Sequence, residues 1–222
     1  MLITILGSCR QIPISKYYTL SNIQEGLTYP HYSKEVVQAI KFCNGTLVIP
    51  NELTKCVFRS GLLNNTILNP EQFTESFNNT DLFIIEIASR LCYEYEGHYV
   101  HHIALDNIRY RLHDYTKIYK RELTDNDIEH DILEIKHLLA GKKLLIVPHI
   151  YTRATGKRYE LVQLIQKICE KYEIPFLDIS YELNKIHPDT SSIYLPETVL
   201  AHYTKYGESV VADIYRTKIE TL

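Results

Sequence analysis

The chain has 222 residues, of which 45% are hydrophobic and 23% are charged. These values are those of an ordinary globular protein, and they exclude a disordered, collagen-like or coiled-coil chain. The 24 Lys and Arg against 27 Asp and Glu give a net charge of -3, so the chain lacks the positive field with which a dedicated nucleic-acid binder neutralises phosphates.

The sequence also limits where the protein is expected to work. It contains no run approaching the roughly 18 apolar residues of a membrane span, and its apolar start, residues 2–6, is shorter than a signal-peptide core. The five cysteines are scattered and form no Cys-x-x-Cys pair, which argues against a disulfide framework or a zinc knuckle. We expect a cytoplasmic protein that folds as one domain over residues 1–222, with reduced thiols.

Short apolar runs alternate with helical patterns along the chain. The runs at 2–6, 46–49, 82–87, 144–147 and 176–179 lack strict alternation, as expected for parallel strands that are covered on both faces. Apolar residues recur at helical spacing over 33–42, 124–139, 158–172 and 206–219. This order predicts an α/β fold, a three-layer sandwich around a mostly parallel five-stranded sheet.

Residues 93–119 interrupt this alternation. The segment is crowded with Tyr and His and shows no clear period, so we interpret it as an irregular insertion that forms either a pocket rim or a surface hairpin. Its histidines, His98, His101 and His102, lack the His-x-x-x-His spacing of a helical metal site. We therefore expect no metal centre.

Ligands of an open parallel sheet bind beyond the carboxyl ends of the strands, so the residues that follow each strand are the candidate site. The polar residues there, with the glycine that turns the chain after the first strand, are Gly7, Ser8, Cys9, Arg10, Ser89, Arg90, His149, Arg153 and, before the last helix, His202.

Cys9 and His202 form the most informative pair of this set. A thiol at the mouth of the sheet becomes a nucleophile when a base or a positive neighbour favours the thiolate, and His202 and Arg10 are suited to these two roles. The plainer alternatives are a small buried Cys9 and a surface His202. Ser8 is the rival nucleophile, and its plainer role is a turn residue that satisfies backbone donors.

Gly7-Ser8-Cys9 after the first strand and His202-x-x-x-x-Gly207 near the end of the chain resemble the first and last motifs of the SGNH/GDSL hydrolase superfamily. The similarity is greatest to the branches with a Gly-x-Cys opening turn, the GSCFA family and the capsule-polysaccharide-biosynthesis family. The resemblance implies a flavodoxin-like fold, with Cys9 in the place of the nucleophilic serine and His202 as the base.

Two features depart from the superfamily pattern. The position three residues before His202, which commonly holds an orienting Asp, is Val199, and the nearest acids are Glu197 and Asp189. The Asn expected after the third strand is replaced by Ser89-Arg90. A Cys-His dyad tolerates the loss of the acid better than a Ser-His pair, because a thiolate is already a good nucleophile.

The resemblance implies an acyltransferase or esterase that acts on a carbohydrate or glycoconjugate, with Gly7, Arg10, Ser89, Arg90, His149 and Arg153 near the oxyanion or the substrate. No cofactor is required. Acyl-coenzyme A is a possible donor substrate, whose phosphates the loop from Arg153 to Arg158 is suited to bind. The alternative is a catalytically degenerate module of the same fold that binds a glycan or a nucleotide. The sequence leaves open whether Ser8 or Cys9 is the nucleophile.

Overall fold

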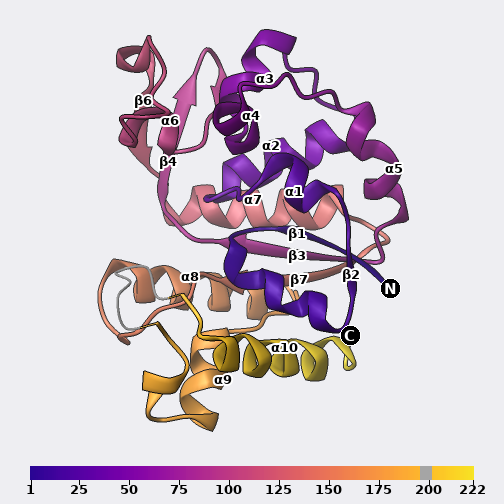
Figure 1. Cartoon of the computed structure of the whole chain (residues 1–222), viewed down its shortest axis with the longest axis vertical. Coiled ribbons are helices and arrows are strands. Elements are labelled where there is room, and N and C mark those ends of the chain that lie inside the picture. The colour runs from indigo at the N-terminus through magenta and orange to yellow at the C-terminus, as the bar shows by residue number, and fades with distance from the viewer. Residues whose placement is uncertain (196–201) are drawn as a thin grey trace.

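A computed structural model describes residues 1–195 and 202–222 of the chain. Its centre is a sheet of four parallel strands in the order β2-β1-β3-β7 (Figure 1). These strands are β1 (Leu2–Leu6), β2 (Thr19–Leu20), β3 (Leu82–Ile87) and β7 (Lys143–Pro148). The chain moves from β1 to β2 on one side and returns to β3 on the other. The crevice between β1 and β3 is therefore the switch point at which such sheets bind ligands.

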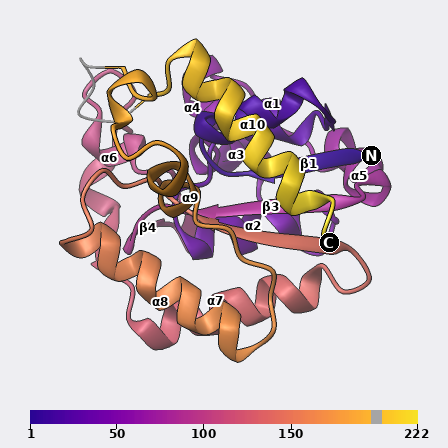
Figure 2. The same cartoon turned by 90° about the horizontal axis from the view of Figure 1, so that it is seen from below.

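Helices cover both faces of this sheet. The main helices of one face are α1 (Ile23–Leu27), α2 (Ser33–Cys43), α5 (Glu71–Asn79), α7 (Asp125–Leu138) and α8 (Lys157–Lys171). The other face carries the 3₁₀ helix η1 (Cys9–Lys16), α9 (Ile179–Ile186) and α10 (Lys205–Ile219). Figure 2 shows α7 and α8 side by side, with α9 and α10 nearer the viewer. The predicted three-layer α/β fold is confirmed.

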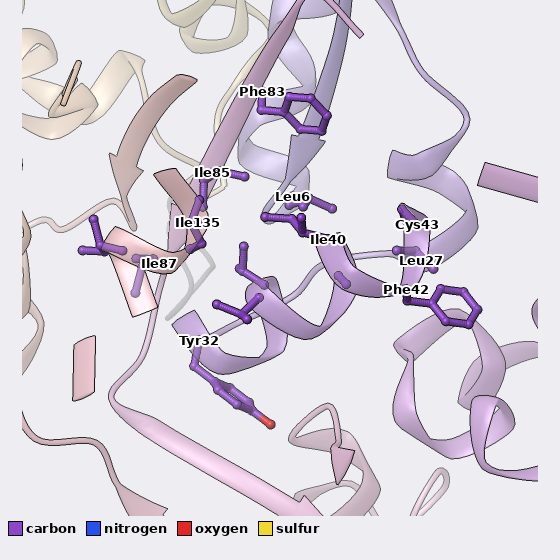
Figure 3. Packing of buried hydrophobic residues seen from close by; sticks show 14 of the residues in the cluster. Leu6, Leu27, Tyr32, Ile40, Phe42, Cys43, Phe83, Ile85, Ile87 and Ile135 are labelled. Atoms are coloured by element: carbon purple, nitrogen blue, oxygen red, sulfur yellow. The ribbon is translucent and has the colours of Figure 1, made fainter. Parts of the chain in front are cut away.

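The strands are hydrophobic on both faces because each face has its own core. Phe83 and Ile85 of β3 belong to the core beneath α2 and α7 (Figure 3), whereas Leu82 and Ile84 point to the core beneath η1 and α10. Side chains of a strand alternate between the faces, so an uninterrupted apolar run places apolar side chains in both cores at once.

Two of the five predicted strands are wrong. Residues 46–49 form no strand, because the N–H groups of Thr46 and Leu47 both donate to the carbonyl of Lys41 and close the end of α2. The edge position belongs to β2 instead. The run 176–179 makes a single parallel bridge, between Phe176 and Ile146, before α9 begins at Ile179. The sheet therefore has four strands.

The segment predicted as an irregular insertion, residues 93–119, contains regular structure, and β4 (Leu91–Tyr95) and β5 (His98–Tyr99) form a hairpin, one of the two forms that the sequence left open. These strands and β6 (Tyr119–Glu122) make a second, antiparallel sheet, with the short helix α6 (Ile103–Asp106). One tyrosine of the segment has a structural role, since the Tyr93 hydroxyl donates to Asp106 Oδ2 at 2.7 Å. The hydroxyl of Tyr32, before α2, lies 2.9 and 2.8 Å from the carbonyl oxygens of Tyr93 and Val100 and ties the segment to the main core. The helices α3 (Asn51–Val57) and α4 (Arg59–Asn64) lie beside the segment (Figure 1).

Within the described residues, every helix falls short of the length and apolarity that crossing a bilayer requires.

Candidate functional site

The turn after β1 fits against a buried carboxylate. Gly7 lies opposite Glu86 of β3, and a Cβ at Gly7 would come within 2.5 Å of the Glu86 Cβ. The backbone N–H of Ser8 donates to Glu86 Oε2, and the Ser8 hydroxyl accepts from the Arg10 N–H at 3.4 Å, which caps η1. The glycine thus allows the close approach on which the position of Cys9 depends.

Glu86 is fully buried and forms a hydrogen bond with the imidazole of His149. The Nδ1 atom of His149 lies 2.5 Å from Glu86 Oε1 at the carboxyl end of β7. Burial alone raises the pKa of Glu86, but the hydrogen bonds and charge of His149 and the bonds from Ser8 outweigh it and lower this pKa to about 2. His149 is therefore a buried support of the turn before Cys9.

Cys9 and His202 line the same cleft, which has a volume of about 580 Å³. Cys9 begins η1 and is partly exposed, whereas the other four cysteines are buried. His202 is held by its backbone, since its carbonyl accepts from the Leu195 N–H at 2.7 Å. The structure therefore brings together the two ends of the chain that the sequence proposed as a dyad.

Basic side chains surround this cleft. Arg10, Lys16 and Lys205 line it, and among the lining residues that the structure describes, Glu208 is the one acid. Arg158, in the first turn of α8, lies within electrostatic reach of Arg10 and Glu86. The cleft therefore favours a substrate with negative charge or a transition state in which negative charge develops.

Tyr203 is a residue of the cleft that sequence reasoning missed. It is buried, and its hydroxyl has no hydrogen-bond partner among the described residues. A buried hydroxyl without a partner costs free energy, so the Tyr203 hydroxyl is available to a ligand or a water molecule in the cleft. The only feature of the sequence that could have indicated Tyr203 is its position directly after His202.

Four imidazoles lie close together near the carboxyl end of β7, and sequence reasoning did not predict this cluster because its members come from three separate segments. His31 lies between His101, His102 and His149, with ring centroids 6.1, 4.8 and 6.3 Å away. Burial, with the neighbouring His102 and His149, lowers the pKa of His31 to about 3. Among the residues that the structure describes, no group of His, Cys, Asp and Glu is placed to hold a metal ion.

A comparison with protein families matches residues 1–114, just over half of the chain, to the TviD N-terminal domain. The chain belongs to this family. The resemblance to the SGNH-like superfamily that Gly7-Ser8-Cys9 and His202 indicated is confirmed by this match.

The chain is also 23% identical to the Vi polysaccharide biosynthesis protein TviD of Salmonella typhi, over 96% of its own length and 31% of that protein. It thus spans about a third of the length of this relative. Among solved structures it is similar to the lipase/acylhydrolase from Enterococcus faecalis, at 14% identity and a TM-score of 0.47, covering 99% of this chain and 95% of that one. It is also similar to LAE5, an alpha/beta hydrolase enzyme from the metagenome of Lake Arreo, Spain, at 12% identity and a TM-score of 0.45, covering 99% and 94%.

In this member of the TviD N-terminal domain family, the remaining predicted residues lie outside the lining of the Cys9 cleft. Ser89 accepts from the Leu91 N–H at 2.9 Å, and Arg90 pairs with Asp125 at 2.5 Å. Both bonds fix the start of the second sheet. Arg153 lies exposed in the loop between β7 and α8.

Two acids, Glu197 and Asp189, are near His202 in the sequence. Glu197, like Val199 at the position of the superfamily's Asp, lies outside the described residues. Asp189 is described, and its carboxylate accepts from the N–H of Ser191 at 3.0 Å. Asp189 therefore has a local role in its own turn.

Proposed function

We propose that the chain is an SGNH-like acyltransferase or esterase that acts on a carbohydrate or glycoconjugate, with Cys9 as the nucleophile and His202 as the base. The observation that carries this proposal is the cleft lined by both residues at the carboxyl edge of the sheet. Cys9 is favoured over Ser8 because Cys9 is partly exposed, whereas Ser8 is buried and engaged with Glu86 and the start of η1.

The proposed reaction has two steps. His202 accepts the thiol proton, the Cys9 sulfur attacks the acyl carbon, and a C–S bond forms as the bond to the leaving group breaks and His202 protonates that group. His202 then accepts a proton from a sugar hydroxyl or from water. The resulting oxygen attacks the thioester, and the thiol leaves and is protonated. Backbone N–H groups after Gly7 and the Arg10 charge are suited to stabilise the oxyanion.

The substrate class follows from two further observations. The name of the Salmonella typhi relative, a polysaccharide biosynthesis protein, supports a carbohydrate acceptor. The basic cleft with Arg10, Lys16 and Lys205 supports an anionic donor such as acyl-coenzyme A. This chemistry requires no metal and no resident cofactor.

The test is turnover of acyl esters and of acyl-coenzyme A with oligosaccharide acceptors by Cys9→Ala and His202→Ala. We expect each variant to lose at least a hundredfold in kcat, because each removes a group that forms bonds or carries the proton. His113→Ala changes a fully exposed histidine and should retain the activity.

Alkylation with iodoacetamide at a series of pH values gives a second readout. Cys9 is the only cysteine that is not buried, so labelling located by mass spectrometry reports on this thiol. We expect His202→Ala to slow the labelling at neutral pH. Full activity of both alanine variants, with labelling unchanged, would contradict the dyad. Binding of a glycan or nucleotide by the natural chain, without turnover of any of these substrates, would instead indicate the degenerate module.

A further inference from the structure

A second cleft lies on the other side of α10 from Cys9. It has a volume of about 690 Å³ and is bordered by α8, α9, α10 and the segment after β7. The residues of α10 that line it are Ile214, Thr217 and Lys218, whereas Lys205, Glu208 and Ser209 line the Cys9 cleft. Nine residues of helix separate Glu208 from Thr217, a rise of about 13 Å. We call the second cleft the tyrosine groove.

The walls of the tyrosine groove are aromatic. Tyr151 and Tyr159 form an edge-to-face pair with ring centroids 5.2 Å apart. Phe176 is partly exposed at the groove, and Tyr181 at the start of α9 is 60% exposed. Aromatic rings held at a cleft without full burial offer apolar faces to a ligand, and the tyrosines add hydroxyls at their edges.

Planar polar groups are set among these rings. Gln163 and Gln166 lie three residues apart and therefore on one face of α8, at the groove. Asp178 and Glu182 come from the start of α9, and the Tyr151 hydroxyl donates to Asp178 at 3.0 Å. Amides offer a donor beside an acceptor and carboxylates offer two acceptors, which match the neighbouring hydroxyls of a sugar ring. Asp178 is held in place by the Tyr151 hydroxyl and the Tyr181 N–H. Gln166 is held in place by Glu170.

The net negative charge of the residues that line the groove argues against an anionic ligand. Two carboxylates face one lysine, Lys218, among the lining residues, so the groove is unsuited to a phosphate-bearing donor. A pyranose ring has an apolar face of C–H groups and a rim of hydroxyls, and it therefore complements both the rings and the planar polar groups. Ligand sites commonly combine such apolar walls with a few placed polar groups.

We propose that the tyrosine groove binds a hydroxyl-rich sugar segment of the polymer whose acylation is proposed for the Cys9 cleft. The inference deepens that proposed function and rests on it for the substrate class. The groove reaches Tyr151, two residues after His149, at the carboxyl edge of the sheet, and from there extends along α10 as far as Thr217 and Lys218. A polymer bound in the groove would thus run towards the edge of the sheet at which the Cys9 cleft lies.

The experiment measures binding of three neutral sugars, maltohexaose, chitohexaose and xylohexaose, to the full chain by calorimetry and saturation-transfer NMR. We expect saturable binding of at least one hexamer, weakened at least tenfold in Tyr181→Ala and in Gln163→Ala. Tyr119→Ala, which removes a tyrosine that is 62% exposed on β6, is the matched control and should bind as the natural chain does. Cys9→Ala should also retain binding.

The failures of the two proposals are distinguishable. Sugar binding that needs Tyr181, without turnover at Cys9, removes the proposed function and keeps the groove as a glycan site. Absence of binding by all three hexamers, or binding that Tyr181→Ala and Gln163→Ala leave unchanged, overturns the groove. A change of oligomeric state in Tyr181→Ala, measured by light scattering, with unchanged sugar binding would show a protein contact and would overturn it as well.

Discussion

At the scale of single residues, Glu86 links the sheet to the proposed nucleophile. Its two oxygens hold the Ser8 N–H and the His149 imidazole, and it has no exposed surface. Neither partner touches substrate in the proposed reaction. Glu86 and His149 are therefore positioning residues, which keep the turn in place so that the Cys9 thiol faces the cleft.

Glu86→Gln should lower the free energy of unfolding at pH 7 by about 1–3 kcal/mol, because a charged hydrogen bond in the interior is replaced by a neutral one. The pKa of Glu86, about 2 in the folded chain against an ordinary 4.5, also makes stability depend on pH. Between these values the unfolded chain binds more protons, so the free energy of unfolding falls as pH drops from 4.5 to 2. Glu86→Gln should flatten this slope.

Urea unfolding at a series of pH values measures both effects. The control is Glu208→Gln, which changes an exposed acid of the Cys9 cleft. An acid slope that is the same in Glu86→Gln and in the natural chain would show that Glu86 is not held as the anion.

At the scale of elements, α2 anchors the strained segment before it. Thr28 and Tyr29 adopt positive φ of 45° and 51°, a region that side chains other than Gly and Asn rarely enter. A hydrogen bond holds this segment against α2: the His31 N–H donates to the carboxyl group of Glu35, in the first turn of the helix, at 2.7 Å. Tyr29 lies within electrostatic reach of Cys9, so this anchor fixes a segment that lies close to the proposed nucleophile.

Burial raises the pKa of Glu35 to about 8, against the opposing hydrogen bond from His31. The folded chain therefore binds more protons than the unfolded chain between pH 4.5 and 8, and the free energy of unfolding falls as pH rises through this range. Glu35→Gln keeps an acceptor for His31 without the ionisation. We expect its stability relative to the natural chain to increase between pH 6 and pH 9 in urea unfolding.

Glu75→Gln, on the exposed face of α5, is the matched control and should follow the natural chain at both pH values. Parallel pH profiles for Glu35→Gln and the natural chain would contradict a neutral Glu35.

At the scale of the whole molecule, one sheet joins two hydrophobic cores. Neighbouring residues of β3 serve different cores, Ile84 beneath α10 and Ile85 beneath α2. Both side chains are fully buried. Because the strand is common to both cores, loss of packing on either face weakens the same structure.

We expect Ile84→Ala and Ile85→Ala each to lower the free energy of unfolding by about 2–5 kcal/mol. Both should shift the same transition when unfolding is followed by circular dichroism and by tyrosine fluorescence. Val48→Ala, at a side chain that is 86% exposed, should change it by less than about 0.5 kcal/mol. Separate transitions for the two variants would show that the cores unfold independently.

The layers of the molecule were predictable from sequence because periodicity directly reports burial. The helix predicted over 124–139 is α7, and the runs 2–6 and 82–87 are β1 and β3. The failures came from short runs, in which burial does not decide the backbone. Residues 46–49 are apolar enough for a strand, but their N–H groups close a helix end.

The site was predictable only in part. Turn chemistry and the order of the strands indicated Cys9 and His202, and both line one cleft. Glu86 was missed because it lies inside an apolar strand, where nothing local distinguishes an acid that supports a turn. His149 was expected to meet a substrate, whereas its partner, Glu86, lies 63 positions away in the chain. Such pairs depend on the register of two strands, which a single sequence does not contain.

The contact between Gly7 and Glu86 has an evolutionary consequence. No side chain fits at Gly7, since a Cβ there would overlap the Cβ of Glu86, an atom that every residue except glycine carries. The acid at position 86 can therefore change without releasing the constraint on Gly7. We expect descendants of this chain to keep the glycine even where the buried acid is lost.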